Sequence, residues 1–137
     1  MDTLKILFTS MAVFLFSAEF SQAQTSTQKD SSLCIHAHTG MSLDEFNTLL
    51  NTDKYVLVDF YADWCAPCRM LAPVIEQIAK EDADRVIVIR VNQDNNKPLF
   101  DALHVYELPT LLIYKNKEVK NTFEGFFPRE MIEAEFK

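Results

Sequence analysis

The sequence predicts a single α/β domain built around a mixed β-sheet, and two arrangements of segments predict it. An apolar strand at 56–61, a long helix beginning near Cys65 and a second apolar strand at 85–91 form a β-α-β unit, whose strands pair in parallel through a right-handed crossover. Two later strands, at 110–114 and 118–123, are close enough along the chain to form a hairpin. The chain has 137 residues, 48% of them apolar, which is enough for one core of this kind.

The first 23 residues have the order of a secretory signal peptide. Lys5 precedes an apolar run at 6–16, and small and polar residues ending at Ala23 follow it. The run is shorter than the roughly 20 residues that span a bilayer, so we expect cleavage after Ala23; an uncleaved membrane anchor is the alternative. Residues 24–32 are rich in Ser, Thr and Gln without an apolar period, which predicts a flexible linker. The folded domain is therefore expected at 33–137.

The net charge of the chain and its expected compartment indicate which kinds of molecule it can act on. The chain carries 20 acidic and 13 basic residues, a formal net charge of −7, so we expect no nucleic-acid partner. An exported protein, periplasmic or extracellular, meets an oxidising compartment, where a reactive cysteine pair either introduces disulfides or removes wrong ones. Nothing in the sequence indicates an obligate oligomer, and we expect a monomer.

Local patterns predict the elements in the first half of the domain. Residues 33–38 alternate between apolar and polar, which suits an edge strand. Ser42 and Glu45 stand three apart as a capping box, which predicts a helix over 43–51. In the long helix, apolar residues recur at helical spacing as far as Ala79, and Pro73 inside it should produce a kink.

The second half is predicted in the same way. A short helix is expected at 95–103, with His104 packing at its end. The hairpin turn falls at 115–117, where Asn116 and Lys117 tolerate positive φ angles only at some cost, so the sequence leaves the turn type open. Pro128 opens a last helix, whose apolar face includes Phe136.

Two cysteines lie where the 56–61 strand passes into the long helix. Cys65 is in the first helical turn, where unpaired backbone N–H groups and the positive end of the helix dipole favour a thiolate. Such a position can lower a cysteine pKa from about 8.5 into roughly 3.5–7.5. Cys68, one turn further, is close enough to close a disulfide with Cys65. A purely structural disulfide is the alternative, but so short a loop would restrict the unfolded chain little. A zinc site would need two further ligands at matching spacing, and we find none.

The segment 64–69, Trp-Cys-Ala-Pro-Cys-Arg, resembles the active-site motif of the thioredoxin family, usually Trp-Cys-Gly-Pro-Cys-Lys. The resemblance extends from about Leu33 to the C-terminus and is supported by Leu108-Pro109-Thr110 and by Gly125. It implies a thioredoxin fold, that is, a central mixed β-sheet of four to five strands with helices on both faces. It also implies a protein thiol:disulfide oxidoreductase that needs no metal and no cofactor beyond its own redox-active disulfide.

The resemblance implies roles for the residues around the cysteines. Cys65, the first and more exposed cysteine, would attack a substrate disulfide, and Cys68 would resolve the mixed disulfide. Asp59 matches the family's buried aspartate and would take the proton from Cys68; an aspartate that reaches water at a strand end is the alternative. Arg90 stands where the family has a lysine, and we expect it to tune the pKa of Asp59 by holding that residue in its charged form.

Substrate contacts are also implied. Pro109 matches the family's cis-proline, which faces the cysteines and would leave the Leu108 backbone free to pair with a substrate strand; an ordinary trans-proline is the alternative. Gly125 matches a glycine that lets a substrate chain approach, although a plain turn would explain it equally. Trp64 would shield the disulfide and touch substrate. The expected substrate-binding residues are Trp64, Ala66, Pro67, Leu108, Pro109 and Gly125.

Cys34 is left outside the pair. Its place in the first predicted strand favours a small buried hydrophobe. Cys34, His36 and His38 would share one face of that strand, so a metal site is the alternative.

The expected activity is the reduction of disulfide-bonded proteins outside the cytoplasm, sustained by an unidentified membrane or protein electron donor. Ala66-Pro67 is one methyl away from the Gly-Pro of reducing relatives. It places no histidine before Cys68, whereas oxidising relatives often have one there to stabilise the thiolate. A disulfide-introducing oxidase is the first alternative. A thioredoxin-fold binding module, with incidental redox chemistry, is the second.

Overall fold

The computed structural model describes residues 34–37 and 40–137. The predicted signal peptide and linker, together with Leu33, His38 and Thr39, lie outside the described residues. In order, the elements are β1 (Cys34–Ala37), α1 (Leu43–Leu49), β2 (Tyr55–Tyr61), α2 (Ala66–Glu81), β3 (Val86–Asn92), α3 (Gln93–Ala102), β4 (Thr110–Lys115), β5 (Glu118–Glu124) and α4 (Arg129–Glu133). Within this part of the chain, no helix is long and apolar enough to cross a membrane.

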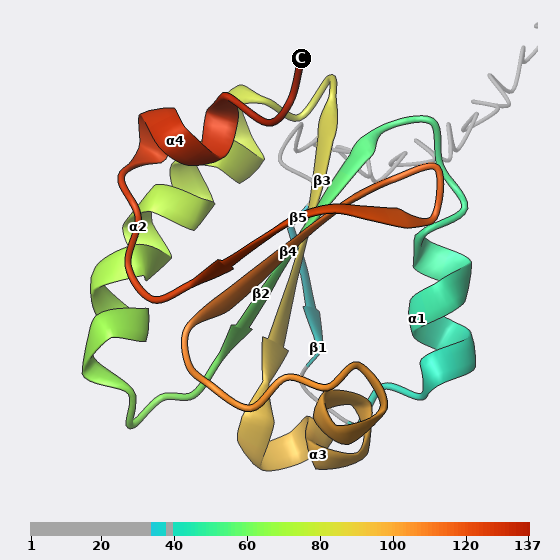
Figure 1. Cartoon of the computed structure of the whole chain (residues 1–137), viewed down its shortest axis with the longest axis vertical. Coiled ribbons are helices and arrows are strands. Elements are labelled where there is room, and N and C mark those ends of the chain that lie inside the picture. The colour runs from blue at the N-terminus through green and yellow to red at the C-terminus, as the bar shows by residue number, and fades with distance from the viewer. Residues whose placement is uncertain (1–33, 38–39) are drawn as a thin grey trace, which may run out of the picture.

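The strands form one mixed sheet in the order β1-β3-β2-β4-β5 (Figure 1). β3 pairs in parallel with both β1 and β2, whereas β4 runs antiparallel to β2, and β5 antiparallel to β4. The β-α-β unit, the hairpin and the edge position of β1 are therefore as predicted. The predicted fold class, a mixed sheet with helices on both faces, is confirmed.

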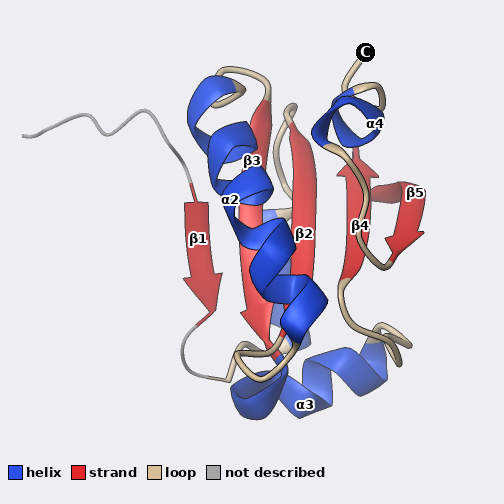
Figure 2. Cartoon of the chain, turned by 90° about the vertical axis from the view of Figure 1, so that its left-hand side faces the viewer, coloured by secondary structure: helices blue, strands red, loops and turns tan. Residues whose placement is uncertain are grey.

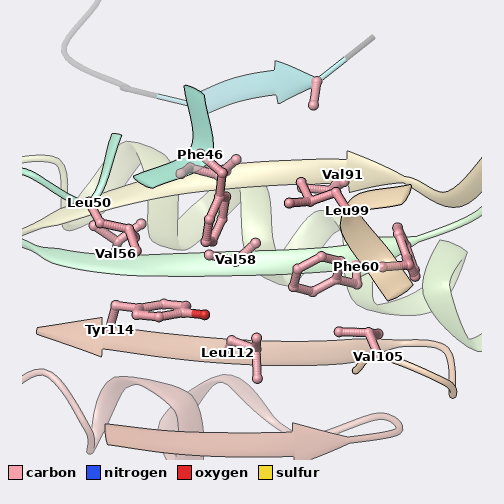
Figure 3. Close-up of a cluster of buried hydrophobic side chains, with 13 residues drawn as sticks. Phe46, Leu50, Val56, Val58, Phe60, Val91, Leu99, Val105, Leu112 and Tyr114 are labelled. Atoms are coloured by element: carbon pink, nitrogen blue, oxygen red, sulfur yellow. The ribbon is translucent and has the colours of Figure 1, made fainter. Parts of the chain in front are cut away.

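Helices cover both faces of the sheet because successive strand residues point to opposite sides. α1 and α3 pack on one face, where Val56, Val58 and Phe60 of β2 belong to the same buried cluster as α1 and α3 side chains (Figure 3). α2 and α4 pack on the other face, with Leu57 of β2 (Figure 2). Asp59, two residues after Leu57, faces α2 by the same alternation.

Aromatic pairs hold the α1/α3 side of the core. The rings of Phe60 and Phe100 meet edge to face at 5.0 Å between centroids, and those of Phe46 and Tyr114 at 5.8 Å. Such geometry adds about 0.5–1.5 kcal/mol to the burial of each pair. β2 is thereby fixed beneath α3, and its C-terminal end carries the loop to Cys65.

Element boundaries differ from the prediction by two residues or more at three helix ends. α1 has the predicted capping box, in which Ser42 Oγ accepts from the Glu45 N–H at 3.2 Å, but it ends at Leu49 rather than residue 51. α3 begins at Gln93, two residues earlier than predicted, because the Asn92 side chain caps it by accepting from the Asp94 N–H at 2.9 Å. α4 ends at Glu133, although Phe136 beyond it is still buried.

Pro73 and the hairpin turn complete the comparison. α2 continues through Pro73 without a break. Asn116 and Lys117 have φ angles of 53° and 66°, which decides the turn type that the sequence left open. This is the turn geometry whose twist matches that of the two flanking strands.

Candidate redox-active site

The two cysteines of the motif are joined by a disulfide at the N-terminus of α2. Cys65 is the N-cap residue and Cys68 lies in the first turn, with their Cα atoms 5.3 Å apart. The Cys68 N–H points at Cys65 Sγ, at 3.3 Å. Cys65 is 5% exposed and Cys68 2%, so the first cysteine is the more accessible, as predicted, although both are largely covered. A thiolate at Cys65 would therefore accept a backbone hydrogen bond and face the positive end of α2.

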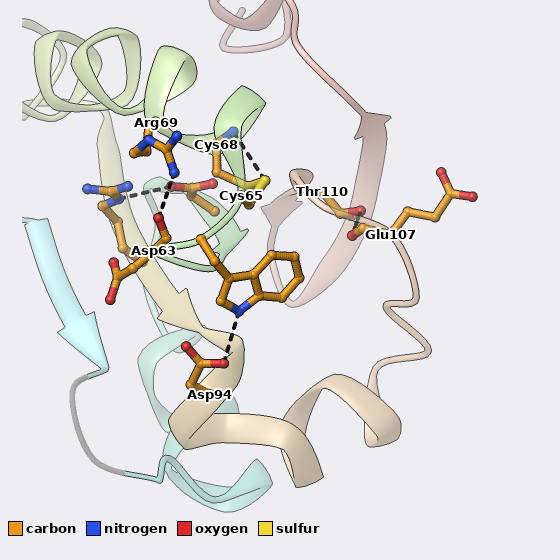
Figure 4. Close-up of a disulfide and its surroundings, with 10 residues drawn as sticks. Asp63, Cys65, Cys68, Arg69, Asp94, Glu107 and Thr110 are labelled. Atoms are coloured by element: carbon orange, nitrogen blue, oxygen red, sulfur yellow. Dashed lines mark hydrogen bonds and ion pairs between the residues drawn. A yellow bond between two sulfur atoms is a disulfide. The ribbon is translucent and has the colours of Figure 1, made fainter.

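Three hydrogen bonds hold the loop that enters α2, and Figure 4 shows the one between Arg69 and Asp63. The Cys65 N–H donates to the Ala62 carbonyl at 3.1 Å, and Arg69 Nη1 donates to the Asp63 carbonyl at 2.9 Å. Asn92 Nδ2 donates to Asp63 Oδ2 at 3.1 Å, which ties the loop to the end of β3. These contacts fix the position of the Cys65 sulfur before any substrate arrives.

Trp64 lies on the outside of this loop. Its side chain is 64% exposed, and Nε1 donates to Asp94 Oδ1 in the first turn of α3 at 3.2 Å (Figure 4). The indole is therefore available to a partner yet held in one orientation. This placement fits the predicted role beside the disulfide.

The segment before β4 approaches the cysteines from the other side. The Leu108–Pro109 peptide bond is cis, as predicted. Leu108 packs against the small buried cluster of Ala62, Cys65 and Cys68. Thr110 Oγ1 donates to the Glu107 carbonyl at 2.9 Å and closes the turn around the proline.

Gly125 is tied to the same turn. Its N–H donates to the Pro109 carbonyl at 2.8 Å, and its φ angle is +102°, a conformation that strongly favours glycine. A Cβ at this position would meet no atom within 4 Å. The backbone conformation, rather than crowding, is therefore what requires glycine here.

Asp59 and Arg90 form a buried ion pair beneath α2. They are Cα partners across β2 and β3, and Arg90 Nε donates to Asp59 Oδ2 at 2.9 Å. Arg90 also lies 4.4 Å over the ring of Tyr61 and 3.7 Å from the Glu76 carboxylate. The predicted pairing is confirmed, and because Asp59 is 1% exposed the alternative of an aspartate that reaches water is wrong.

The expected effect of Arg90 on the charge of Asp59 needs correction. Burial raises the pKa of Asp59, and the Arg90 guanidinium only partly offsets that effect. Among the described residues, no group donates to the other carboxylate oxygen, Oδ1. Arg90 therefore lowers the cost of ionising Asp59 without holding it firmly in the charged form.

Cavities open on both sides of the disulfide. One, of about 360 Å³, is lined by Trp64, Cys65, Ala66, Pro67, Gln93, Tyr106 and Leu108. It brings four of the predicted substrate-binding residues together with Cys65. The second, of about 210 Å³, has Cys68 and Arg90 in its lining and lies toward β1.

Sequence reasoning missed several residues of this site. Gln93 and Tyr106 line the larger cavity, Asp94 holds Trp64, and Asn92 braces the cysteine loop. His104 lies just beyond the end of α3, as predicted; it is exposed and contacts Tyr106. The sequence contained one indication of these residues: Tyr106 is an aromatic residue three positions before Pro109, in the segment expected to bind substrate.

Cys34 is half-buried in β1 and packs against the cluster beneath α2. Its Sγ lies 3.5 Å from His36 Nε2, and burial raises the pKa of the thiol. Packing against apolar neighbours agrees with the small-hydrophobe prediction. His38, the third member of the alternative metal site, lies outside the described residues.

Comparisons with known proteins agree with this geometry. The thioredoxin family model matches residues 38–137. A thioredoxin of Alicyclobacillus acidocaldarius subsp. acidocaldarius is 40% identical over 90 residues, which make up 66% of this chain and 86% of that protein. A thioredoxin of Chlorobaculum thiosulfatiphilum is 42% identical over 84 residues, 61% and 78% of the two chains.

Solved structures support the same assignment. A mutant thioredoxin from Halobacterium salinarum NRC-1 superposes with a TM-score of 0.68 at 27% identity, covering 78% of this chain and 90% of that one. Thioredoxin from Malassezia sympodialis gives a TM-score of 0.63 at 29% identity, covering 74% and 87%. With Leu108, the residue before its cis-proline, packed beside a Cys-x-x-Cys disulfide, the chain belongs to the thioredoxin family of protein-disulfide oxidoreductases, enzymes whose redox-active disulfide is part of the protein itself.

Proposed function

We propose that this protein is an exported disulfide reductase that acts on disulfide-bonded proteins through a mixed disulfide at Cys65. The observation that carries the proposal is the place of Cys65, the N-cap of a 16-residue helix with the Cys68 N–H on its sulfur. Backbone donors and the helix dipole there stabilise a thiolate, which is the nucleophile of disulfide exchange. The binding-module alternative is set aside, because thioredoxins are oxidoreductases.

The reaction runs in two exchanges. The Cys65 thiolate attacks one sulfur of the substrate disulfide, and the other substrate sulfur leaves as a thiolate and takes up a proton. Cys68, once deprotonated, attacks Cys65 Sγ, which breaks the mixed disulfide and releases the second substrate thiol. The substrate gains two electrons and two protons, and the protein ends as the Cys65–Cys68 disulfide.

Asp59 is the proposed acceptor of the Cys68 proton. It faces α2, the helix that carries Cys68, and its partner Arg90 lines the same cavity as Cys68. Burial raises the pKa of Asp59, so the carboxylate is a stronger base than an exposed one and is better matched to a thiol. Because it acts on the second cysteine, Asp59 should affect resolution rather than the first attack.

Separate cysteine variants test this chemistry. In Cys68→Ser, attack by Cys65 should stall at a mixed disulfide that accumulates with a peptide or protein substrate, whereas Cys65→Ser should form none. Alkylation of the reduced wild-type protein across pH should give Cys65 a pKa well below the ordinary value of about 8.5. An ordinary Cys65 pKa, or trapping at Cys68 instead, would refute the proposed mechanism.

The two residues between the cysteines are the basis for proposing that the protein reduces disulfides rather than introduces them. The side chains of Ala66 and Pro67 carry no charge and no hydrogen-bond donor that would stabilise a thiolate at Cys65 further. We therefore expect a potential near the roughly −270 mV of thioredoxin rather than the roughly −120 mV of strong disulfide oxidases. Equilibration with glutathione buffers measures it, and a potential near the upper value would make the protein an oxidase.

Export, the electron donor and the oligomeric state are proposals from the sequence. We propose that residues 1–23 direct export to the periplasm or the extracellular space, that a membrane or protein donor returns the disulfide to its dithiol form, and that the protein is a monomer. Expression of the full chain in a bacterial host, followed by fractionation and N-terminal sequencing, should yield an exported protein beginning at Gln24. A membrane-bound protein that still begins at Met1 would show that residues 1–23 act as an uncleaved anchor. A protein found in the cytoplasm would contradict export.

A further inference from the structure

The larger cavity beside Cys65 has two aromatic walls, and disulfide exchange itself uses neither Tyr106 nor its support. Trp64 and Tyr106 both line the cavity, and the two residues are 64% and 77% exposed. Large apolar groups exposed at a concave site mark a place where a ligand is bound. The cavity directly adjoins the sulfur that attacks the substrate.

α3 holds both aromatic residues from its two ends. At its beginning, Asp94 Oδ1 accepts from Trp64 Nε1 at 3.2 Å (Figure 4). Just beyond its end, His104 takes a φ of 57°, and its Nδ1 lies 3.1 Å from the Tyr106 hydroxyl, with the two rings 6.3 Å apart. Gln93, the first residue of α3, lines the cavity as well. Both aromatic side chains are therefore oriented before binding, which lowers the entropy that binding must remove.

The lining indicates the chemistry of the occupant. It consists of two aromatic rings, a proline ring, alanine and leucine side chains, the cysteine and one amide, without a charged residue. Its volume of about 360 Å³ is near the lower limit of ligand pockets, which span roughly 300–1,000 Å³. This space suits one large apolar side chain of a polypeptide. Cys65 is one of the lining residues, so a substrate side chain in this cavity must belong to a residue close to the substrate sulfur that Cys65 attacks.

We propose that this cavity is a specificity subsite for a large apolar side chain, above all an aromatic one, on the residue adjacent to the target cysteine, and that Tyr106 selects it. The inference rests on the proposed disulfide reduction. The subsite acts in the first exchange: the bound side chain positions the neighbouring substrate sulfur against the Cys65 thiolate. The second exchange, at Cys68, releases that side chain together with the reduced substrate.

Paired peptides test the subsite on the full chain. Each of two short peptides, which contain one cysteine, is oxidised to its own symmetric disulfide. The two peptides differ only in the residues that flank the cysteine on both sides, which are phenylalanine in one peptide and glycine in the other. Single-turnover oxidation of the reduced protein can be followed by fluorescence, because Trp64 is the only tryptophan of the chain and adjoins Cys65. For the wild type we expect the phenylalanine peptide to react about tenfold faster, since small changes in an apolar pocket alter rates by about 10-fold or more.

Three variants assign the selectivity. Tyr106→Ala should bring the two rate constants to within about twofold of each other, because the second aromatic wall is gone. Tyr106→Phe should keep most of the preference, because the ring remains. Met131→Ala, which removes another half-exposed apolar side chain, on α4 and outside the cavity lining, should keep the preference in full.

The outcomes separate this inference from the proposed function. Slow reaction of the wild type with both peptides, at the rate of an ordinary thiol, would mean that the proposed reduction has failed. Rapid but equal reaction with both would leave that function standing and overturn the subsite. A preference that survives in Tyr106→Ala, or is lost in Tyr106→Phe as fully as in Tyr106→Ala, would overturn selection by the Tyr106 ring.

Discussion

Asp59 is the only charged residue of β2, and the fold buries it almost completely. Its neighbours along the strand are core side chains, and Arg90 on β3 satisfies one of its two oxygens. Ionising such a carboxyl is costly, and a single partner offsets that cost only in part. A buried carboxyl of this kind contributes little to folding stability, and a role in proton transfer explains its presence better.

We expect Asp59→Asn to remove part of the pH dependence of folding stability. Burial raises the pKa of Asp59 above its unfolded value of about 3.9, so the folded state binds the proton more tightly than the unfolded one. The stabilisation from this residue is then complete below about pH 4 and is lost as pH rises through the folded pKa. Relative to the variant, the wild type should lose free energy of unfolding with rising pH, measured by urea denaturation of the oxidised protein.

The opposite slope would show that Arg90 outweighs burial and lowers the folded pKa of Asp59. The reduced variant supplies the functional control. Its first attack on a peptide disulfide should proceed at the normal rate, and resolution of the mixed disulfide by Cys68 should be slow. Normal resolution in Asp59→Asn would remove Asp59 from the mechanism.

At the scale of elements, the β3–α3 junction holds several residues of the site in place, although it lies far along the chain from Cys65 and Cys68. Asn92 ends β3 and caps α3 through its side-chain oxygen, while its side-chain nitrogen holds Asp63 of the cysteine loop. α3 in turn orients Trp64 through Asp94 and Tyr106 through His104. One junction therefore connects three parts of the site.

We expect Asn92→Ala to impair the site in a way that an ordinary cap substitution does not. Loss of the cap should lower the free energy of unfolding by about 0.5–2 kcal/mol, and loss of the contact with Asp63 should alter the alkylation rate of Cys65. Ser42→Ala is the matched control, because it removes the cap of α1, which lies outside the site. Denaturation and alkylation measured on both variants decide the matter; an unchanged Cys65 rate in Asn92→Ala would mean that Asp63 does not need its partner.

At the scale of the whole molecule, the sheet divides the core into two layers that share β2, β3 and β4. Phe46 of α1 and Phe100 of α3 pack on one side, and Ile75 and Ile78 of α2 and Ile132 of α4 pack on the other. The redox motif follows β2, a strand that both layers share, and its two cysteines form a third, small buried cluster with Ala62. Its geometry thus depends on both cores, although each core is a separate set of contacts.

We expect substitutions in the two layers to add. Ile89→Val on the α1/α3 side and Ile78→Val on the α2 side should each lower the free energy of unfolding by about 0.5–1.5 kcal/mol. Because the two residues belong to different buried clusters, the double variant should lose the sum to within about 0.5 kcal/mol. Denaturant titrations measure all three, and a larger departure would mean that the sheet transmits strain between the layers.

Local pattern was enough to predict the architecture and the pairing of the two cysteines. Continuous apolar runs located β2 and β3, the long helix between them required parallel pairing, and the short turn before Glu118 required an antiparallel hairpin. Cys65 and Cys68 are three residues apart, so their proximity follows from helix geometry alone. Asp59 and Pro109 were found through the family resemblance, because a charge in a strand and a single proline have no unique meaning by themselves.

The sequence by itself therefore determined the sheet, the helices and the cysteine pair, since these depend on periodicity and on neighbours within one helical turn. Only the tertiary structure decided that burial outweighs Arg90 at Asp59, that Asn92 caps α3 and braces Asp63, and that Tyr106 shares a cavity with Cys65. Each of these depends on side chains that are distant along the chain and meet only when the sheet assembles. Local periodicity carries no information about which distant side chains meet, or about how much water the fold removes from them.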